Sequence, residues 1–207
     1  MYAPACDDEI TTILHYVSDQ LDAIRASAIG LTEEQVRLRP CRSALSIGGL
    51  VKHAIYVMRG TTERLTGTAD PNRSLDEAAF IAHEASFALA DDETAADVLA
   101  TFDAVRVDYL EAIGATDPSA QTIVAPAPWY GIYDSRPAFM RYGLVHQIEE
   151  LARHAGHADI IREELDGMAV PAIVLSESGA PANDFFEPYV AAPGTIGARE
   201  RVATPPG

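Results

Sequence analysis

The sequence is short of several features that would define its class at once. It has only two cysteines among 207 residues, Cys6 and Cys41, and no Cys-x-x-Cys pair. That usage argues against a disulfide framework and a cysteine-based zinc site, and it indicates a reducing compartment. No apolar run approaches the ~20 residues of a membrane-spanning helix, and the N-terminus lacks the basic and apolar regions of a signal peptide. We therefore expect a cytoplasmic protein with no membrane partner.

Basic residues are also scarce. Lys and Arg total 15 against 31 Asp and Glu, which gives a formal net charge of −16. A surface of this sign repels nucleic-acid phosphates and anionic lipids, so neither class of partner is expected. Apolar residues make up 48% of the chain, which is enough for one globular domain with a sizeable core at this length.

What the sequence does contain is helical periodicity. Apolar residues recur at three- and four-residue steps, and no alternating pattern is long enough to support a sheet. The predicted helices cover residues 8–28, 46–66, 93–113 and 141–167. We therefore predict an all-α four-helix bundle. Its long connection, residues 68–91, allows a crossover between the second and third helices and has room for a short helix at 75–87, with His83 at the surface.

Two other segments are expected to be irregular. Residues 115–135 are rich in proline and aromatic residues, which is typical of a loop at the edge of a pocket or of a packing lid. Residues 168–207 form a Pro/Gly-rich extension of the helical domain at 1–167, and we expect this extension to be dispensable for the fold. Phe185 and Phe186 are predicted to anchor it on the bundle or on a neighbouring subunit, so a homodimer stays open.

The last predicted helix is unusual in where its polar residues fall. At about 100° per residue, Glu150, His154 and His157 lie on one line with apolar positions, and His146 lies close beside them. An ionised carboxylate on the core side of a helix needs a cation or a dense hydrogen-bond network. His53 lies at the edge of the apolar stripe of the second helix, and it becomes the candidate third ligand of a metal site.

Two imidazoles and one carboxylate leave coordination positions open, as in a catalytic rather than a structural zinc site. Zinc is the first candidate, and nickel, cobalt and iron accept the same ligands. A thiol at an open position would become a nucleophilic thiolate. Since the site-bearing helices carry no cysteine, a small-molecule cosubstrate would supply it. His157 and His146 are candidate catalytic residues that orient a ligand or shuttle a proton, the alternative being satisfied interior histidines.

Two stretches carry a resemblance to a known family. They are LSIGGLVKHAIYV around His53 and HQIEELARHAGHADIIREELDG around Glu150. Residues 8–167 resemble the DinB-like superfamily, and more closely the branch that includes the metal-binding domain of mycothiol-dependent maleylpyruvate isomerase. The resemblance implies a metal held by a histidine, a glutamate and a histidine, which match His53, Glu150 and His154. It also implies mycothiol as the thiol.

Two functions fit these observations. The first is a metal-dependent thiol S-transferase or isomerase, which activates a low-molecular-weight thiol such as mycothiol as a metal-bound thiolate toward an electrophilic small molecule. The second is a non-catalytic metal- or ligand-binding helical bundle. Open coordination positions facing a pocket favour the first function, whereas positions filled by His146 or His157 favour the second.

Overall fold

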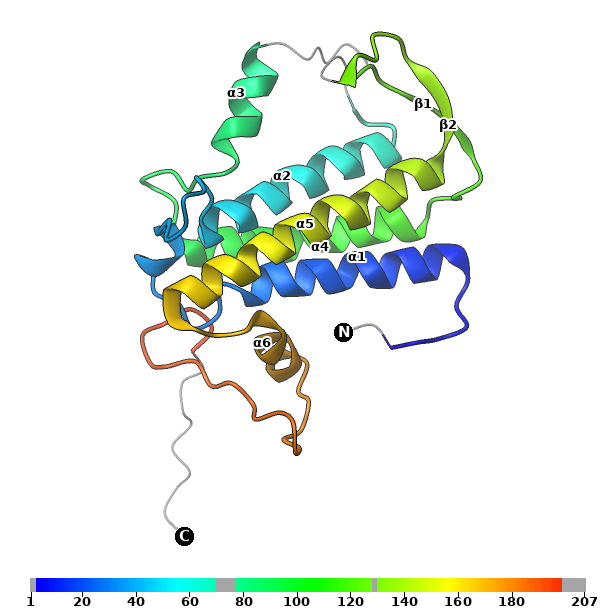
Figure 1. Cartoon of the computed structure of the whole chain (residues 1–207). Helices are drawn as coiled ribbons and strands as arrows, with labels where there is room; N and C mark the ends of the chain where they lie inside the picture. The colour runs from blue at the N-terminus through cyan, green and yellow to red at the C-terminus, as the bar shows by residue number, and fades with distance from the viewer. Residues whose placement is uncertain (1–2, 70–76, 128–129, 199–207) are drawn as a thin grey trace.

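The computed structural model describes residues 3–69, 77–127 and 130–198. Four long helices run alongside one another within these ranges (Figure 1), and α2 packs chiefly on α4 while α1 packs chiefly on α5. The predicted all-α four-helix bundle is confirmed, and each helix begins and ends within a few residues of its predicted bounds. The helices are α1 (Glu9–Ala26), α2 (Ile47–Leu65), α4 (Ala95–Gly114) and α5 (Met140–Asp166).

Local sequence signals fix the ends of these helices. The Ser46 hydroxyl caps α2 by accepting a hydrogen bond from the N–H of Gly49 (3.2 Å), and Thr94 caps α4 in the same way. Gly167 ends α5 with a φ of 75°, the left-handed conformation that glycine adopts without strain. None of the helices in the described ranges has the length and apolar character needed to cross a bilayer. Side chains buried between the helices include Val17, Leu21, Leu50, Met58, Phe102, Tyr109, Leu151 and Ile161.

The connection between α2 and α4 matters most for the site. It contains the short helix α3 (Glu77–Ala85), which confirms the helix expected at 75–87. Residues 75–76 lie outside the described ranges, and residues 86–87 follow the end of α3. After α3 the chain passes close to the start of α2. A Cβ atom at Gly49 would lie only 2.0 Å from the carbonyl oxygen of Phe87. The absence of a side chain at Gly49 therefore allows this segment to lie directly against α2.

The segment 115–135 is not wholly irregular, contrary to our expectation. Strand β1 (Gln121–Val124) pairs in antiparallel fashion with β2 (Arg136–Phe139), and the hairpin leads directly into α5. A four-residue strand offers too few alternating positions for its pattern to stand out from a loop. Residues 128–129 of this segment lie outside the described ranges.

The extension after Gly167 likewise begins with a helix, α6 (Val170–Glu177). Pro171 stands in the first turn of α6, where a proline costs no hydrogen bond, so its presence did not argue against a helix. Val170 and Ile173 pack with Ala26 and Ile29 in a second hydrophobic cluster. The prediction of a wholly irregular extension was therefore wrong at α6.

A buried arginine ties the extension to the bundle. Arg162 of α5 has no solvent exposure, and its Nη1 donates to the carbonyl oxygens of Ser27 (2.8 Å) and Ile29 (2.6 Å). Its Nε and Nη2 donate to the two carboxylate oxygens of Asp166, and its guanidinium lies 5.9 Å from the ring centre of Tyr189. These contacts connect the end of α5, the loop after α1 and the extension.

The two predicted anchors differ sharply. Phe186 is 8% exposed and belongs to the buried residues, whereas Phe185 is 99% exposed. Phe185 lies in a tight turn between Asn183 and Phe186, where its N–H donates to the Asn183 side chain and its ring faces solvent. Only Phe186 is placed to act as an anchor.

Candidate metal centre

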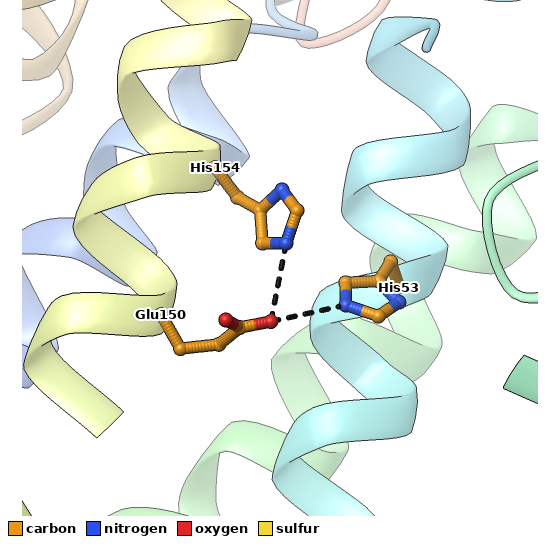
Figure 2. A group of neighbouring side chains, drawn as sticks. All are labelled: His53, Glu150 and His154. Atoms are coloured by element: carbon orange, nitrogen blue, oxygen red, sulfur yellow. Dashed lines mark hydrogen bonds and ion pairs between the residues drawn. The ribbon is translucent and has the colours of Figure 1, made fainter. Parts of the chain in front are cut away.

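Three side chains from two facing helices converge on one point (Figure 2). His53 comes from α2, and Glu150 and His154 come from successive turns of α5. The Glu150 Oε1 atom lies 3.4 Å from His53 Nε2 and 3.2 Å from His154 Nε2. One ligand atom from each of the three residues lies within 4.8 Å of the others. The structure thus brings together the three ligands that we expected from the sequence.

The centre lies at the edge of the core. His53 is 1% exposed and His154 is 9% exposed, while the Glu150 side chain keeps 26% of its surface in contact with solvent. The two imidazoles are therefore held by packing, and the carboxylate remains partly open to solvent. A small molecule can approach such a centre from the side of Glu150.

The donor atoms and their spacing fit a divalent cation. Two ligands about 2.1 Å from a tetrahedral zinc ion lie about 3.4 Å from each other. The two separations around Glu150 Oε1, 3.4 Å and 3.2 Å, are close to this value, and all three ligand atoms lie within 4.8 Å of one another. Two imidazole nitrogens and one carboxylate oxygen also form a ligand set that zinc accepts with positions left open. The residues present therefore fit a metal of this class.

Electrostatics favour the forms of Glu150 and His53 that bind a cation. The neighbouring imidazoles, His154 first and then His53, hold the pKa of the Glu150 carboxyl well below its usual range. Burial lowers the pKa of the His53 imidazole. At neutral pH the carboxylate is thus ionised and the His53 ring is neutral, which is the protonation state that metal binding requires.

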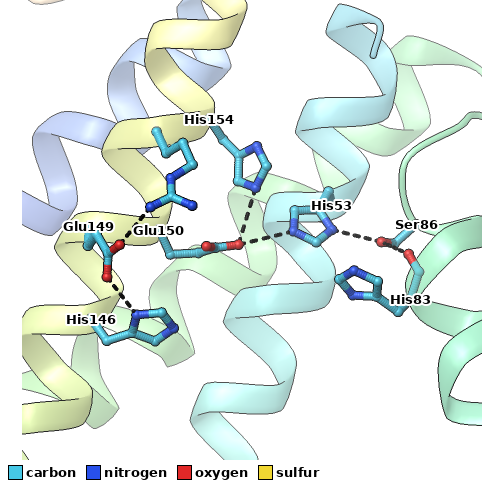
Figure 3. A network of polar contacts seen from close by, with 8 residues as sticks. His53, His83, Ser86, His146, Glu149, Glu150 and His154 are labelled. Atoms are coloured by element: carbon cyan, nitrogen blue, oxygen red, sulfur yellow. Dashed lines mark hydrogen bonds and ion pairs between the residues drawn. The ribbon is translucent and has the colours of Figure 1, made fainter. Parts of the chain in front are cut away.

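The far side of His53 contacts three residues from the connection that contains α3. Nδ1 of His53 lies 2.8 Å from the Ser86 hydroxyl (Figure 3). The ring stacks on Phe87 with 3.8 Å between ring centres. His83 lies edge-on to the His53 ring at 5.4 Å. Sequence reasoning placed His83 at the surface and did not single out Ser86 or Phe87. Their three- and four-residue spacing was the available signal, because it places all three on one helical face.

The two histidines predicted to be catalytic lie in different surroundings. The His157 ring centre lies 5.6 Å from that of His154, and its buried Nδ1 has no hydrogen-bond partner among the described residues. Burial lowers the pKa of His157. His146 instead lies on the exposed face of α5, with Nδ1 3.1 Å from Glu149 Oε2 (Figure 3). The buried position beside it is taken by Gln147, so His146 has no part in the function proposed below.

A recess lies behind His53, on the side of Ser86 and away from Glu150, and none of the three converging residues lines it. It has a volume of about 350 Å³ and is bordered by α2, α3 and the start of α4. Ile55 and Val98 contribute apolar walls, and Tyr56 and Arg59 contribute polar groups. Its size is within the range of small-molecule pockets. Ser86 borders this recess and also contacts His53.

A helical bundle with inward histidine and glutamate ligands on facing helices defines a class of metal-binding bundles, to which the DinB-like fold belongs. Residues 12–167 match the family model described as Mycothiol-S-transferase. The match covers most of the chain and contains all three converging residues, so the chain belongs to the mycothiol-S-transferase family. This confirms the resemblance to the mycothiol-related branch of the DinB-like superfamily. No curated protein and no solved structure matches the chain significantly.

Proposed function

We propose that this protein joins mycothiol, through its sulfur atom, to an electrophilic small molecule. The reaction takes place at a divalent metal held by His53, Glu150 and His154. One observation carries the proposal: three ligand atoms from two helices converge at the edge of the core, and the carboxylate among them still contacts solvent. The family match supports the class of thiol. Zinc is the first metal to test, because its preferred ligands and spacing fit the three residues.

The reaction is a displacement or addition at carbon. A divalent ion in this centre would lower the pKa of a thiol bound to it, so that the sulfur reacts as a thiolate at neutral pH. In a displacement, the sulfur forms a bond with the electrophilic carbon, the bond to the leaving group breaks, and the leaving group departs with the electron pair. In an addition, the electron pair of the carbon's double bond moves to the neighbouring atom, which takes up a proton from solvent. The thiol proton passes to solvent.

The surrounding side chains have distinct tasks in this proposal. The ring of His157 lies beside that of His154 and is only partly buried, so it can orient a bound thiol or electrophile. In this proposal His53, Glu150 and His154 hold the ion, and His157 contacts the organic reactants.

The alternative of a non-catalytic metal bundle has less support. It required His146 or His157 to fill the free coordination positions. Instead His146 is bound to Glu149 on the exposed face, and among the described residues the ring of His157 contacts that of His154 with 5.6 Å between ring centres.

The proposal is tested with zinc-loaded protein, mycothiol and chlorodinitrobenzene, following the release of the thioether product by absorbance. We expect a mycothiol-dependent rate that is lost in Glu150→Ala and retained in Glu149→Ala. His157→Ala is expected to bind zinc as the wild type does but to lose most of the rate, because it orients reactants without holding the ion. Mycothiol should also raise the melting temperature of the zinc-loaded protein. If mycothiol gives neither a thermal shift nor a rate above that of buffer, the proposed function is wrong.

A further inference from the structure

We propose that Ser86 is a positioning residue that fixes the tautomer of His53, so that its Nε2 presents a lone pair to the metal. Ser86 contacts Nδ1 of His53, on the side of the ring away from Glu150. This role of Ser86 rests on the proposed metal site, but the hydrogen bond between Ser86 and His53 forms with or without an ion.

The direction of this hydrogen bond follows from counting hydrogens. The Ser86 hydroxyl has one hydrogen, and its oxygen lies 2.5 Å from the carbonyl oxygen of His83. A carbonyl oxygen only accepts, so the Ser86 hydrogen is directed to His83. Toward Nδ1 of His53, at 2.8 Å, the Ser86 oxygen can then only accept. The hydrogen of a neutral His53 ring is therefore on Nδ1.

A neutral imidazole carries one hydrogen, so Nε2 of His53 is left with a lone pair. This lone pair faces Glu150 Oε1 at 3.4 Å, which places two acceptors opposite each other. A cation between them resolves this arrangement. If Ser86 did not accept from Nδ1, the hydrogen could move to Nε2, donate to Glu150 and occupy the position that the metal needs.

The surroundings make Ser86 hard to replace by solvent. Ser86 is 4% exposed, and the ring of Phe87 covers one face of His53. A buried N–H that loses its acceptor stays unsatisfied, which costs free energy and favours the other tautomer. Gly49 allows this segment to approach α2 and so sets the position of the hydroxyl.

The chain offers a matched control. Ser27 is also buried, and its hydroxyl donates to the carbonyl of Ile24, three residues earlier, at the end of α1. Ser86 makes the same three-residue contact at the end of α3. Ser27→Ala therefore removes a comparable buried hydroxyl that does not contact a histidine. Ser86→Thr and Ser86→Val form a second pair of nearly equal size, of which only the first retains the hydroxyl.

The test combines nitrogen NMR of the histidine rings with zinc affinity. Spectra of the metal-free protein are recorded well above the usual imidazole pKa of about 6.5. We expect hydrogen on Nδ1 of His53 in the wild type, Ser27→Ala and Ser86→Thr, and a shift toward Nε2–H in Ser86→Ala and Ser86→Val. Zinc affinity is expected to fall about ten- to hundred-fold in Ser86→Ala and Ser86→Val, and to stay at the wild-type value in Ser27→Ala and Ser86→Thr.

Two results would overturn the inference: an unchanged tautomer in both Ala and Val, or a changed tautomer with wild-type zinc affinity. If the wild-type protein binds no zinc, the proposed function fails, and the spectra alone decide whether Ser86 sets the tautomer of His53. The failure of one proposal is thus distinguishable from the failure of the other.

Discussion

At the scale of single residues, the site depends on direction rather than on chemical type. Glu149 and Glu150 are adjacent and identical, but Glu149 binds Arg153 and His146 on the exposed face while Glu150 reaches His53 and His154. A turn of about 100° along the helix separates a solvated ion pair from a candidate metal ligand.

This pair gives the first prediction. Glu150→Ala should weaken zinc binding by at least about a hundred-fold, because it removes one of three protein ligands. Glu149→Ala should leave zinc affinity within about two-fold of the wild type, since the pair that it breaks is exposed. Calorimetric titration of both variants checks this. An equal loss in the two variants would show that the metal is bound on the exposed face instead.

The second prediction concerns pH. The folded pKa of Glu150 lies below its ordinary value of 4.5, so the ionised carboxylate stabilises the fold above about pH 4.5 and this contribution is lost on further acidification. The lowered pKa of His53 also makes stability fall on acidification. Below about pH 6.5 the His53 side chain binds a proton more readily in the unfolded chain than in the folded protein, which favours unfolding. Urea unfolding of the metal-free protein should therefore show stability falling with acidification.

The variant Glu150→Gln isolates the carboxylate in that experiment. The difference in unfolding free energy between wild type and variant should be constant above about pH 6 and shrink below about pH 4.5. A difference that grows on acidification would mean that the folded pKa of Glu150 is raised rather than lowered.

At the scale of helices and connections, the close approach of Phe87 to Gly49 places Ser86 behind His53. In Gly49→Ala the added Cβ atom would meet the Phe87 carbonyl at 2.0 Å, so the segment carrying Ser86 must move. We expect a loss of about 1–3 kcal/mol in unfolding free energy, together with weaker zinc binding.

Gly60 in the same helix is the matched control. Its added Cβ atom would meet only the Arg64 side chain, at an ordinary 3.5 Å. Gly60→Ala should leave zinc binding unchanged and stabilise the protein by about 0.5–1 kcal/mol, because alanine is the better helix former. Equal stabilities of the two variants in urea would contradict the close packing of residues 86–87 on α2.

The extension supplies a second test at this scale. Phe186→Ala should cost about 2 kcal/mol, less than a phenylalanine in the centre of a core because Phe186 lies at its margin. Phe185→Ala should change the unfolding free energy by no more than about 0.5 kcal/mol, since its ring is in solvent. Thermal unfolding of the two variants checks the difference, and equal losses would mean that Phe185 is buried in solution by another contact.

Truncation at Gly167 now has a different expected result from the one that the sequence suggested. It would remove Val170 and Ile173 from Ala26 and Ile29, and Tyr189 from above the buried Arg162. The extension is therefore part of the packed structure, and the truncated chain should melt well below the full one.

At the scale of the whole molecule, the sequence predicted what depends on long regular patterns. α5 runs without interruption over 27 residues, so a helical projection was enough to place Glu150 and His154 on one inward face. His53, at the edge of the stripe of α2, became a candidate only beside these two residues. The four helical patterns predicted the bundle, and these three positions predicted the centre within it.

The remaining features depend on contacts that no local pattern expresses. Ser86 reaches His53 only because Gly49 admits the chain from a distant segment, and α6 is held by Ala26 and Ile29. His146 shows the limit of projection itself, because it lies about 40° from the line of Glu150, as His154 does on the other side, yet His154 is buried and His146 is exposed. Long-range packing, rather than periodicity, decided each of these cases.

The most direct test of the metal centre is anomalous diffraction at the zinc absorption edge, from crystals grown with one equivalent of zinc. We predict one strong peak within bonding distance of His53 Nε2, Glu150 Oε1 and His154 Nε2. The absence of a peak at these three atoms, or a peak at His146 and Glu149 instead, would contradict the metal centre described above.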